Sequence, residues 1–414
     1  MAHDQTGESG SAAEGGHGTD LVIEVVGGLD GTVEPAAWDA LTGDDNPFVE
    51  HGFLAGLEAS GSVGAGTGWV PRHLLVREAD GGRLVGASPL YLKDDSYGEY
   101  IFDWGWANAA HRAGISYYPK LVSAVPFTPA TGPRLMVHPD VEADGARAEV
   151  VGALVGGALA VAERERASGI HWLFCTEREA GELAGRGLLR RLTHQYHWDN
   201  AGYASFDDFT AAMTSKRRKE VRRERARAQS HGLDIRLLRG DELSREDWDA
   251  LYGFYRNTIA ERGAIPYLKR GFYREIARRV PERVRAVIAY EGDRPVAGTL
   301  NFMKGDRLFG RYWGAVDAWD ALHFECCYYR LIDYAIAEGV TRFEAGAQGQ
   351  HKIARGFLPS ATHSAHFLAH PGLRDAVARH LDYEADAIRA EMAMLADHGP
   401  FKSASDADLP DRSG

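Results

Sequence analysis

Cysteine is scarce in this chain, and its scarcity excludes two kinds of site. Only Cys175, Cys326 and Cys327 occur among 414 residues. Three cysteines cannot build a disulfide framework, and no pair has the CxxC spacing that is typical of structural zinc. We therefore expect free thiols, a reducing cytoplasm, no metal centre and no cofactor. In FECCYYRLI, Cys326 and Cys327 are expected to be small core side chains.

A basic leader and a long apolar run are also missing. The first twenty residues contain neither Lys nor Arg, so we expect no signal peptide there. The longest apolar stretch, Val150 to Ala162, is interrupted by glycines and is too short to span a bilayer. The net charge of −12 excludes binding to a polyanion through overall charge, so that such a partner would need a local basic patch.

A repeated hairpin divides the chain into two similar halves. HLLVRE (73–78) and RLVGASPLYLK (83–93) flank a Gly-Gly turn, and RAVIAY (285–290) and PVAGTLNFMK (295–304) flank EGDR. Alternating apolar positions on both sides of such turns predict strand hairpins. Each half then continues with a helix and a short buried strand, and Gly169 and Gly339 occupy the expected helix C-caps.

The repeat predicts two domains, in keeping with the length of the chain. We expect a first lobe over 21–203, a second lobe over 204–396, and disordered tails at 1–20 and 397–414. In the second half, strands and helices are expected in the order β-α-α-β-β-β-α-β between residues 233 and 344. This order is that of GNAT acyltransferases, so the predicted fold is mixed α/β with two tandem GNAT-like lobes.

Several longer strings carry a family resemblance. They are YYPKLVSAVPFTPATGPRL (117–135), GRYWGAV (310–316), LHFECCYY (322–329) and FEAGAQGQHKIARGF (343–357). The sequence resembles the FemAB-like branch of the GNAT superfamily, over about residues 46–384. The resemblance implies two GNAT-like lobes of Fem type and transfer of amino acids from aminoacyl-tRNA to peptidoglycan precursors. Relatives act on other amines or hydroxyls, including those of natural-product pathways.

One departure from the Fem pattern falls in the last string. Lys352, Gly356 and Phe357 match the Phe-Lys…Gly-Phe segment of Fem proteins, but His351 stands where those proteins have Phe. The detailed role of Lys352 is therefore left open by the resemblance.

Two features predict that the acyl donor is aminoacyl-tRNA and not CoA: a missing pyrophosphate-binding pattern and a basic run. The turn GAVDAWDA (314–321) lacks the pyrophosphate-binding pattern of CoA-dependent GNAT enzymes, and its two aspartates would repel phosphate. The run SKRRKEVRRERARAQ (215–229) concentrates positive charge, either as a solvated helix or as a phosphate-binding surface for tRNA. Residues predicted to bind the donor are Lys216, Arg217, Arg218, Arg222, Arg223, Gln348 and His351.

The acceptor is predicted to bind an aromatic segment. Residues 102–134 are dense in Trp, Tyr, His and Pro, which indicates either a buried structural loop or a pocket for an anionic acceptor. The predicted acceptor residues are Tyr117, Tyr118, Lys120, Phe127, Thr128, Arg134, Arg311 and Tyr312.

The predicted catalytic residues are His323, Glu344, Lys352 and Arg355. Acyl transfer needs a proton acceptor, for which His323 or Glu344 is suited, and a cation at the oxyanion or a phosphate, for which Lys352 and Arg355 are suited. Each residue has a structural alternative as well. The favoured function is aminoacyl transfer to an amine or hydroxyl. The alternatives are a CoA-dependent N-acyltransferase and a non-catalytic recognition protein.

Overall fold

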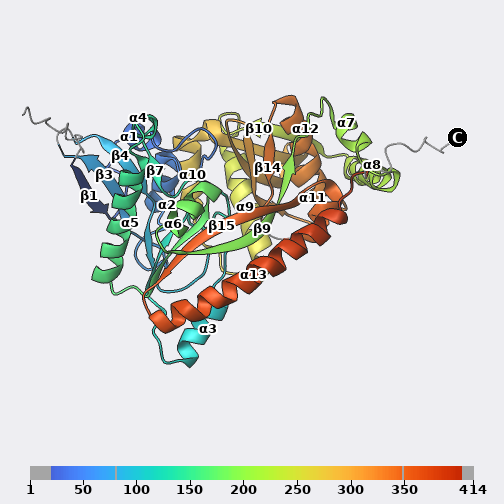
Figure 1. Cartoon of the computed structure of the whole chain (residues 1–414). Coiled ribbons are helices and arrows are strands. Elements are labelled where there is room, and N and C mark those ends of the chain that lie inside the picture. The colour runs from blue at the N-terminus through green and yellow to red at the C-terminus, as the bar shows by residue number, and fades with distance from the viewer. Residues whose placement is uncertain (1–19, 80–81, 347–348, 403–414) are drawn as a thin grey trace, which may run out of the picture.

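The computed structural model describes residues 20–79, 82–346 and 349–402. Its strands form a sheet of 11 strands and a smaller sheet of four strands, with helices packed on their faces (Figure 1). The four-stranded sheet lies at one end of an elongated molecule, and helices α7 and α8 lie at the other (Figure 1). Within the described ranges, no helix combines the length and the apolar character needed to cross a membrane.

The first half of the chain supplies the smaller sheet and one end of the larger one. The smaller sheet has the order β1-β3-β4-β7, and β2, β5, β6 and β8 belong to the larger sheet. The elements are β1 (Leu21–Val26), α1 (Pro35–Asp39), α2 (His51–Ala59), β2 (Val70–Pro71), β3 (His73–Glu78), β4 (Leu84–Ser88), β5 (Tyr91–Lys93), α3 (Trp104–Arg112), β6 (Lys120–Ser123), β7 (Met136–Val137), α4 (Pro139–Ala143), α5 (Arg147–Arg164), β8 (Gly169–Cys175), α6 (Glu177–Ala184) and β9 (Leu189–Asp199).

The second half confirms the predicted order of strands and helices. Its elements are α7 (Phe206–Ala211), α8 (Ser215–Ser230), β10 (Asp234–Arg239), α9 (Arg245–Glu261), α10 (Arg270–Arg279), η1 (Pro281–Arg283), β11 (Val284–Glu291), β12 (Arg294–Lys304), β13 (Arg307–Ala315), α11 (Leu322–Phe324), the π-helix η2 (Glu325–Tyr329), α12 (Arg330–Ala337), β14 (Arg342–Glu344), η3 (Gln350–Arg355), β15 (Leu358–Leu368) and α13 (Pro371–Asp397). Strands β10 to β13 form an antiparallel meander, as their alternating apolar pattern predicts.

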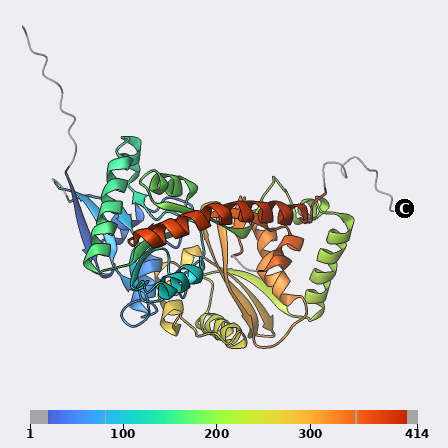
Figure 2. The same cartoon turned by 60° about the horizontal axis from the view of Figure 1, so that its bottom comes forward.

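Two strands join the halves into one sheet. The order at the junction is β13-β14-β9-β15-β8, so that β9 of the first half lies between β14 and β15 of the second. Strand β15 in turn pairs with β8 of the first half. Helix α13 packs along β9 and β15 and runs across both halves (Figure 2). The predicted lobes, 21–203 and 204–396, are each continuous in sequence. The large sheet is not divided between them, because strands from before residue 203 pair with strands from after it.

The two glycines predicted as helix C-caps have different roles. Gly339 follows α12 with φ +69°, a left-handed conformation that suits the end of a helix. The prediction for Gly169 is wrong, because α5 already ends at Arg164 and Gly169 is the first residue of β8. A Cβ at Gly169 would lie 2.4 Å from the carbonyl oxygen of Phe367, so close backbone approach requires glycine there.

Ordered structure continues past residue 396, the end that the sequence predicts for the second lobe. Helix α13 extends to Asp397, and Phe401 forms an antiparallel bridge with Met213. The ring of Phe401 also packs against Phe209 of α7, with ring centroids 6.2 Å apart. The segment that follows α13 thus covers the second-half core.

Because β9 has both of its neighbours in the second half, we predict that residues 21–203 do not fold cooperatively alone. Both edges of β9 would be left unpaired. Circular-dichroism melting of this fragment should show no cooperative transition, and co-expression with residues 204–414 should restore one. An isolated fragment that melts cooperatively would contradict this prediction.

Candidate functional site

A cavity of about 300 Å³ opens where two parallel strands separate. Strands β13 and β14 pair only between Arg307–Phe309 and Arg342–Glu344, and β13 continues to Ala315 paired with β12 but not with β14. Gly310 to Trp313, from the part of β13 beyond β14, line one side, and Ala345 and Gly346 after β14 line another.

Helices and loops from both halves close the cavity. His323, Cys327 and Tyr328 come from α11 and the π-helix, a type of helix that is frequent at functional sites. The opposite wall belongs to α9 and the loop after it, and the first half contributes Tyr100 and Pro129. Residues of that opposite wall are Tyr255, Thr258, Ile259, Arg262 and Tyr267.

The lining of the cavity is cationic although the protein is acidic. Arg262, Arg311 and Lys352 line it, and none of its described lining residues is Asp or Glu. The net charge of the whole chain is −12. Low-dielectric walls strengthen the field of these cations, so that the cavity suits a group that carries or develops negative charge.

Lys352 is held at the base of this cavity by main-chain groups. Its Nζ donates hydrogen bonds to the carbonyl oxygen of Ala345 and, at 3.1 Å, to that of Gly346. Burial lowers the pKa of Lys352 to about 8. The ammonium group is therefore still charged at neutral pH, and its position is fixed by the turn after β14.

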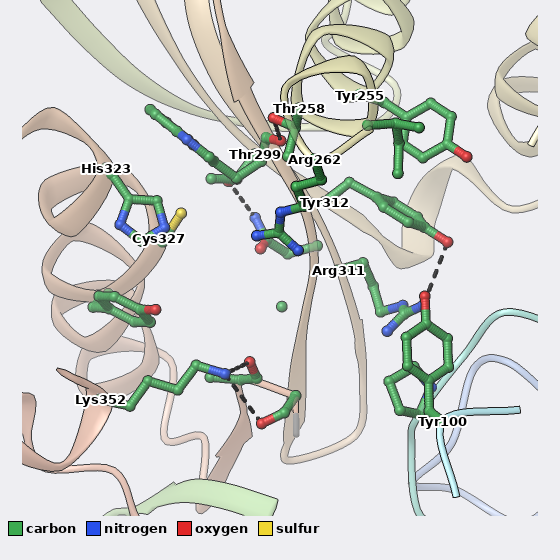
Figure 3. Close-up of a pocket in the computed structure, with 18 of the residues that line it drawn as sticks. Tyr100, Tyr255, Thr258, Arg262, Thr299, Arg311, Tyr312, His323, Cys327 and Lys352 are labelled. Atoms are coloured by element: carbon green, nitrogen blue, oxygen red, sulfur yellow. Dashed lines mark hydrogen bonds between the residues drawn. The ribbon is translucent and has the colours of Figure 1, made fainter. Parts of the chain in front are cut away.

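His323 lies across the cavity from Tyr100 (Figure 3). Burial, followed by the positive charge that neighbouring His351 would carry, lowers the pKa of His323 to about 4. At neutral pH its imidazole is uncharged and has a nitrogen able to accept a proton. His351 lies 5.9 Å from it between ring centroids, and its Nε2 is 3.0 Å from the hydroxyl of Tyr328.

Cys327 is the cavity's thiol. Burial raises the pKa of Cys327 well above its ordinary value. Since the thiolate and not the thiol is the nucleophile, Cys327 acts as an apolar part of the wall.

Arg355 and Glu344, two of the predicted catalytic residues, do not line the cavity. Arg355 pairs with Glu224 at 2.6 Å and lies over the ring of Phe324, 3.3 Å from its centroid. Glu344 is buried beside the cavity, accepts a hydrogen bond from the Thr131 main chain at 3.4 Å, and its pKa is raised to about 7 by burial. Both side chains hold the walls rather than reach the cavity.

Three of the predicted acceptor residues, Tyr117, Tyr118 and Lys120, belong to a separate buried cluster. The ammonium group of Lys120 binds Asp103 and, at 2.9 Å, Glu99, while the Tyr117 hydroxyl donates to Asp103 at 2.7 Å. The Tyr118 hydroxyl is 2.8 Å from the hydroxyl of Ser96 in the same cluster. A fully buried lysine needs such counterions, so these residues are structural and the sequence-based assignment is corrected.

The proline-rich segment 124–134 fills the space where two parallel strands of the first half separate. Strands β6 and β8 pair in parallel only between Leu121–Ser123 and Ile170–Trp172. Beyond that point Arg134 donates hydrogen bonds to the carbonyl groups of Leu173, at 2.8 Å, and Ala130, at 2.9 Å. Arg134 is therefore corrected from an acceptor residue to the anchor of this plug.

The same plug forms part of the cavity wall in the second half. Phe127 stacks on Tyr267 with centroids 4.5 Å apart, and its carbonyl accepts a hydrogen bond from Arg311. The hydroxyl of Thr128 donates to the carbonyl of Pro126 at 3.0 Å and does not reach the cavity. Of the predicted acceptor residues, Arg311 and Tyr312 line the cavity directly.

Helix α8 carries the predicted donor residues on two different faces. Lys216, Arg222 and Arg223 are exposed. Arg217 is paired with Glu220 at 2.7 Å, and Arg218 donates to the carbonyl of Thr210 at 3.1 Å. Of the other two, His351 lines the cavity and Gln348 lies outside the described residues.

Sequence reasoning missed most of the aromatic and cationic wall opposite His323. Tyr100, Tyr255, Arg262 and Tyr267 come from segments that have no motif of their own. One signal in the sequence could have pointed to Arg262 as a site residue. It is a cation at the C-terminal end of α9, a helix that the sequence did predict.

Comparison with known proteins agrees with this architecture. The model of the FemAB-like family, described as peptidoglycan biosynthesis/recognition, matches residues 31–403. The protein has a mixed α/β fold that resembles that of FemX, and the chain belongs to the FemAB-like family. A comparison with curated proteins found no match to the sequence.

Solved structures are similar to this chain at low sequence identity, and FemX shares its fold. FemX has 11% identity and a TM-score of 0.51, with 84% of this chain and 98% of FemX covered. A tandem GNAT protein from the clavulanic acid biosynthesis pathway has 14% identity and a TM-score of 0.43, with coverages of 85% and 99%. L-PGS from Bacillus licheniformis has 10% identity and a TM-score of 0.47, with coverages of 82% and 98%.

We predict that Lys120→Met lowers the free energy of unfolding by about 3–5 kcal/mol, because Glu99 and Asp103 would lose their buried counterion. Urea denaturation measures this loss. Lys216→Met, at an exposed position, is the control and should change stability by less than about 0.5 kcal/mol. A loss below about 1 kcal/mol for Lys120→Met would contradict the structural role.

We also predict that Lys352 titrates near pH 8, well below the ordinary lysine value of about 10.4. Burial disfavours the charged form, so the ammonium group loses its proton as the pH rises through this value. NMR of 13C-methylated lysines measures the midpoint. Because the pKa of Lys93 is also lowered to about 8 by burial, the signal is assigned by its disappearance in Lys352→Arg. A midpoint above pH 10 would contradict the prediction.

Proposed function

We propose that this protein transfers an acyl group from an activated ester to an amine or hydroxyl, with aminoacyl-tRNA as the favoured donor and a small molecule or cell-wall precursor as acceptor. The observation that carries the proposal is the cavity between β13 and β14. It combines a neutral imidazole, a fixed ammonium group and the absence of Asp and Glu from its described lining. Membership of the FemAB-like family supports the same class of reaction.

The chemistry assigns one task to each of two side chains. His323 accepts the proton of the acceptor as its nitrogen or oxygen attacks the ester carbonyl carbon. The carbonyl oxygen becomes an oxyanion, which the ammonium group of Lys352 stabilises. Collapse of this intermediate breaks the ester bond, and the proton held by His323 passes to the leaving hydroxyl. Direct transfer is favoured because the thiol of Cys327 stays protonated.

A CoA donor is disfavoured by the start of the helix that follows β13. The main-chain N–H groups of Leu322 and Phe324 are bonded within the turn, to Trp319 at 3.3 Å and Ala321 at 3.0 Å. The carboxylate of Glu325 lies in the first turn, where it pairs with Arg225 at 3.1 Å. A pyrophosphate needs open N–H groups and no competing carboxylate at such a helix start.

Helix α8 supports a polyanionic donor. Its inner face is tied to the cavity wall, since Glu224 pairs with Arg355 in the turn that also carries Lys352. Its outer face exposes four cations for which no acidic partner is found among the described residues, namely Lys216, Lys219, Arg222 and Arg223. A tRNA backbone bound there would have its acceptor end close to the cavity.

We predict that changing these four cations to Glu abolishes retention of aminoacyl-tRNA in filter binding, because the phosphate contacts become repulsive. Binding to the unchanged protein should weaken steeply with salt as counterions are released. The fold should survive, since all four side chains are exposed. Arg218 is left unchanged because it bonds the carbonyl of Thr210.

A matched variant controls for total charge. It changes four other exposed arginines to Glu, namely Arg112, Arg164, Arg274 and Arg379. This control should retain binding to within about threefold. If both variants lose tRNA retention equally, the binding reflects only non-specific attraction between tRNA and positive charge. If acetyl-CoA binds tightly in calorimetry while tRNA is not retained, the choice of donor is reversed. Failure of both ligands would favour a non-catalytic recognition protein.

A further inference from the structure

One amide side chain in the cavity wall is buried and has an unused oxygen. Asn301 of β12 lines the cavity and is only 2% exposed. Its Nδ2 donates both hydrogens, to the carbonyl of Arg285 at 2.9 Å and to the hydroxyl oxygen of Thr299 at 2.7 Å. Among the residues that the structure describes, no donor reaches Oδ1. A buried acceptor without a donor is costly, so a ligand that supplies the missing hydrogen bond accounts for it.

The neighbouring strands fix the orientation of this amide. Asn301 and Thr299 lie opposite Arg285 and Val287 of β11. If the amide were turned over, Oδ1 would face the carbonyl oxygen of Arg285, and two acceptors cannot bond each other. Oδ1 is therefore held as a hydrogen-bond acceptor for whatever occupies the cavity.

A β-bulge gives a ligand access to Oδ1. The pairing of β12 with β13 shifts between Leu300 and Asn301, so that Asn301 faces Gly310. Bulges redirect side chains and are frequent beside active sites. Gly310 also lines the cavity, and a Cβ at this position would lie 3.7 Å from Oδ1. The missing side chain of Gly310 thus leaves room for a small group beside Oδ1.

Asn301 lies at the end of the cavity where Lys352 is anchored. Strand β13 lies between β12 and β14, and the last pair of the β13–β14 ladder joins Phe309 to Glu344. Gly310 and Ala345 are the next residues of these two strands, and the carbonyl of Ala345 accepts a hydrogen bond from Lys352. An ester carbonyl bound by Lys352 would therefore place its acyl group over Gly310, with Asn301 on the far side.

The charges around the cavity determine the charge of a group bound there. Arg262, Arg311 and Lys352 surround it (Figure 3) and repel an ammonium group. A neutral amide oxygen accepts a hydrogen bond from an uncharged amino group equally well. An α-amino group has an ordinary pKa of about 7.7–8.0, so it loses its proton at little cost near neutral pH.

We propose that Asn301 binds the uncharged α-amino group of the acyl donor and so selects aminoacyl groups over plain acyl groups. The assignment rests on the proposed function, because it takes the ester carbonyl to lie at Lys352. The amino group is attached one carbon from that carbonyl, and its N–H donates to Oδ1. Every α-amino acid carries this group, so Asn301 recognises the class of donor and not its side chain.

The test compares two stable analogues of the donor, namely tRNA whose 3′ end carries glycine or acetate in amide linkage. Glycine is the part that α-amino acids share, and acetate lacks only its amino group. In calorimetry without an acceptor, the unchanged protein should bind the glycyl analogue at least tenfold more tightly, because acetate leaves Oδ1 without a donor. Asn301→Leu should bind both analogues equally. The matched control Asn108→Leu, at an exposed position of α3, should keep the preference.

A second variant leaves the two hydrogen bonds of Asn301 in place. Gly310→Ala puts a methyl group 3.7 Å from Oδ1, where the amino group is expected. This variant should also lose the preference for glycine. A circular-dichroism melt within a few degrees of that of the unchanged protein separates lost recognition from lost folding.

Two results would overturn the role of Asn301 and leave the donor standing. The first is equal binding of the two analogues by the unchanged protein, which would assign the N–H group to the acceptor. The second is a preference for glycine that survives in both Asn301→Leu and Gly310→Ala. If neither analogue binds, the proposed function fails, and this assignment fails with it.

Discussion

The pairing of β9 with β14 and β15 is the constraint on which the site depends. Strand β9 belongs to the first half of the chain and has both neighbours in the second. Because β15 continues to β8, the two halves share one hydrogen-bonded sheet and cannot rotate as independent domains. This rigid connection allows residues separated by more than two hundred positions, such as Tyr100 and Lys352, to line one cavity. It also sets the plug at 124–134 against the opening between β13 and β14.

The two halves differ where each has a short pair of parallel strands. In each half, two parallel strands pair briefly and then separate. In the first half the opening is filled by the plug, with Arg134 bonded to the carbonyl groups of Leu173 in β8 and of Ala130 in the plug itself. In the second half the opening remains as the cavity, and the plug contributes Pro129 to its wall. The first half therefore supports the site in the second half.

Burial determines the charge states within the cavity. The same desolvation lowers the pKa of His323 to about 4 and that of Lys352 to about 8. At neutral pH the first is uncharged and able to accept a proton, and the second is a cation, as the proposed reaction needs. The thiol of Cys327 is suppressed by the same burial. Its neighbour Cys326 is a core residue, as its apolar surroundings in the sequence predicted.

The sequence alone determined the order of strands and helices between residues 233 and 344 and much of the cavity's cationic side. Alternating apolar positions predicted β11 to β13, and local charge identified α8, because periodicity and charge are properties of neighbouring residues. His323, Lys352 and Arg311 were found because they lie in recognisable strings. The roles of Lys120, Arg134 and Arg355 were decided only by the tertiary structure. A charged side chain near a motif can face a cavity or a buried counterion, and the choice depends on partners such as Glu99, the carbonyl of Leu173 and Glu224. These partners are distant in sequence and are brought close only by the exchanged strands and the packed helices, so no local pattern encodes them.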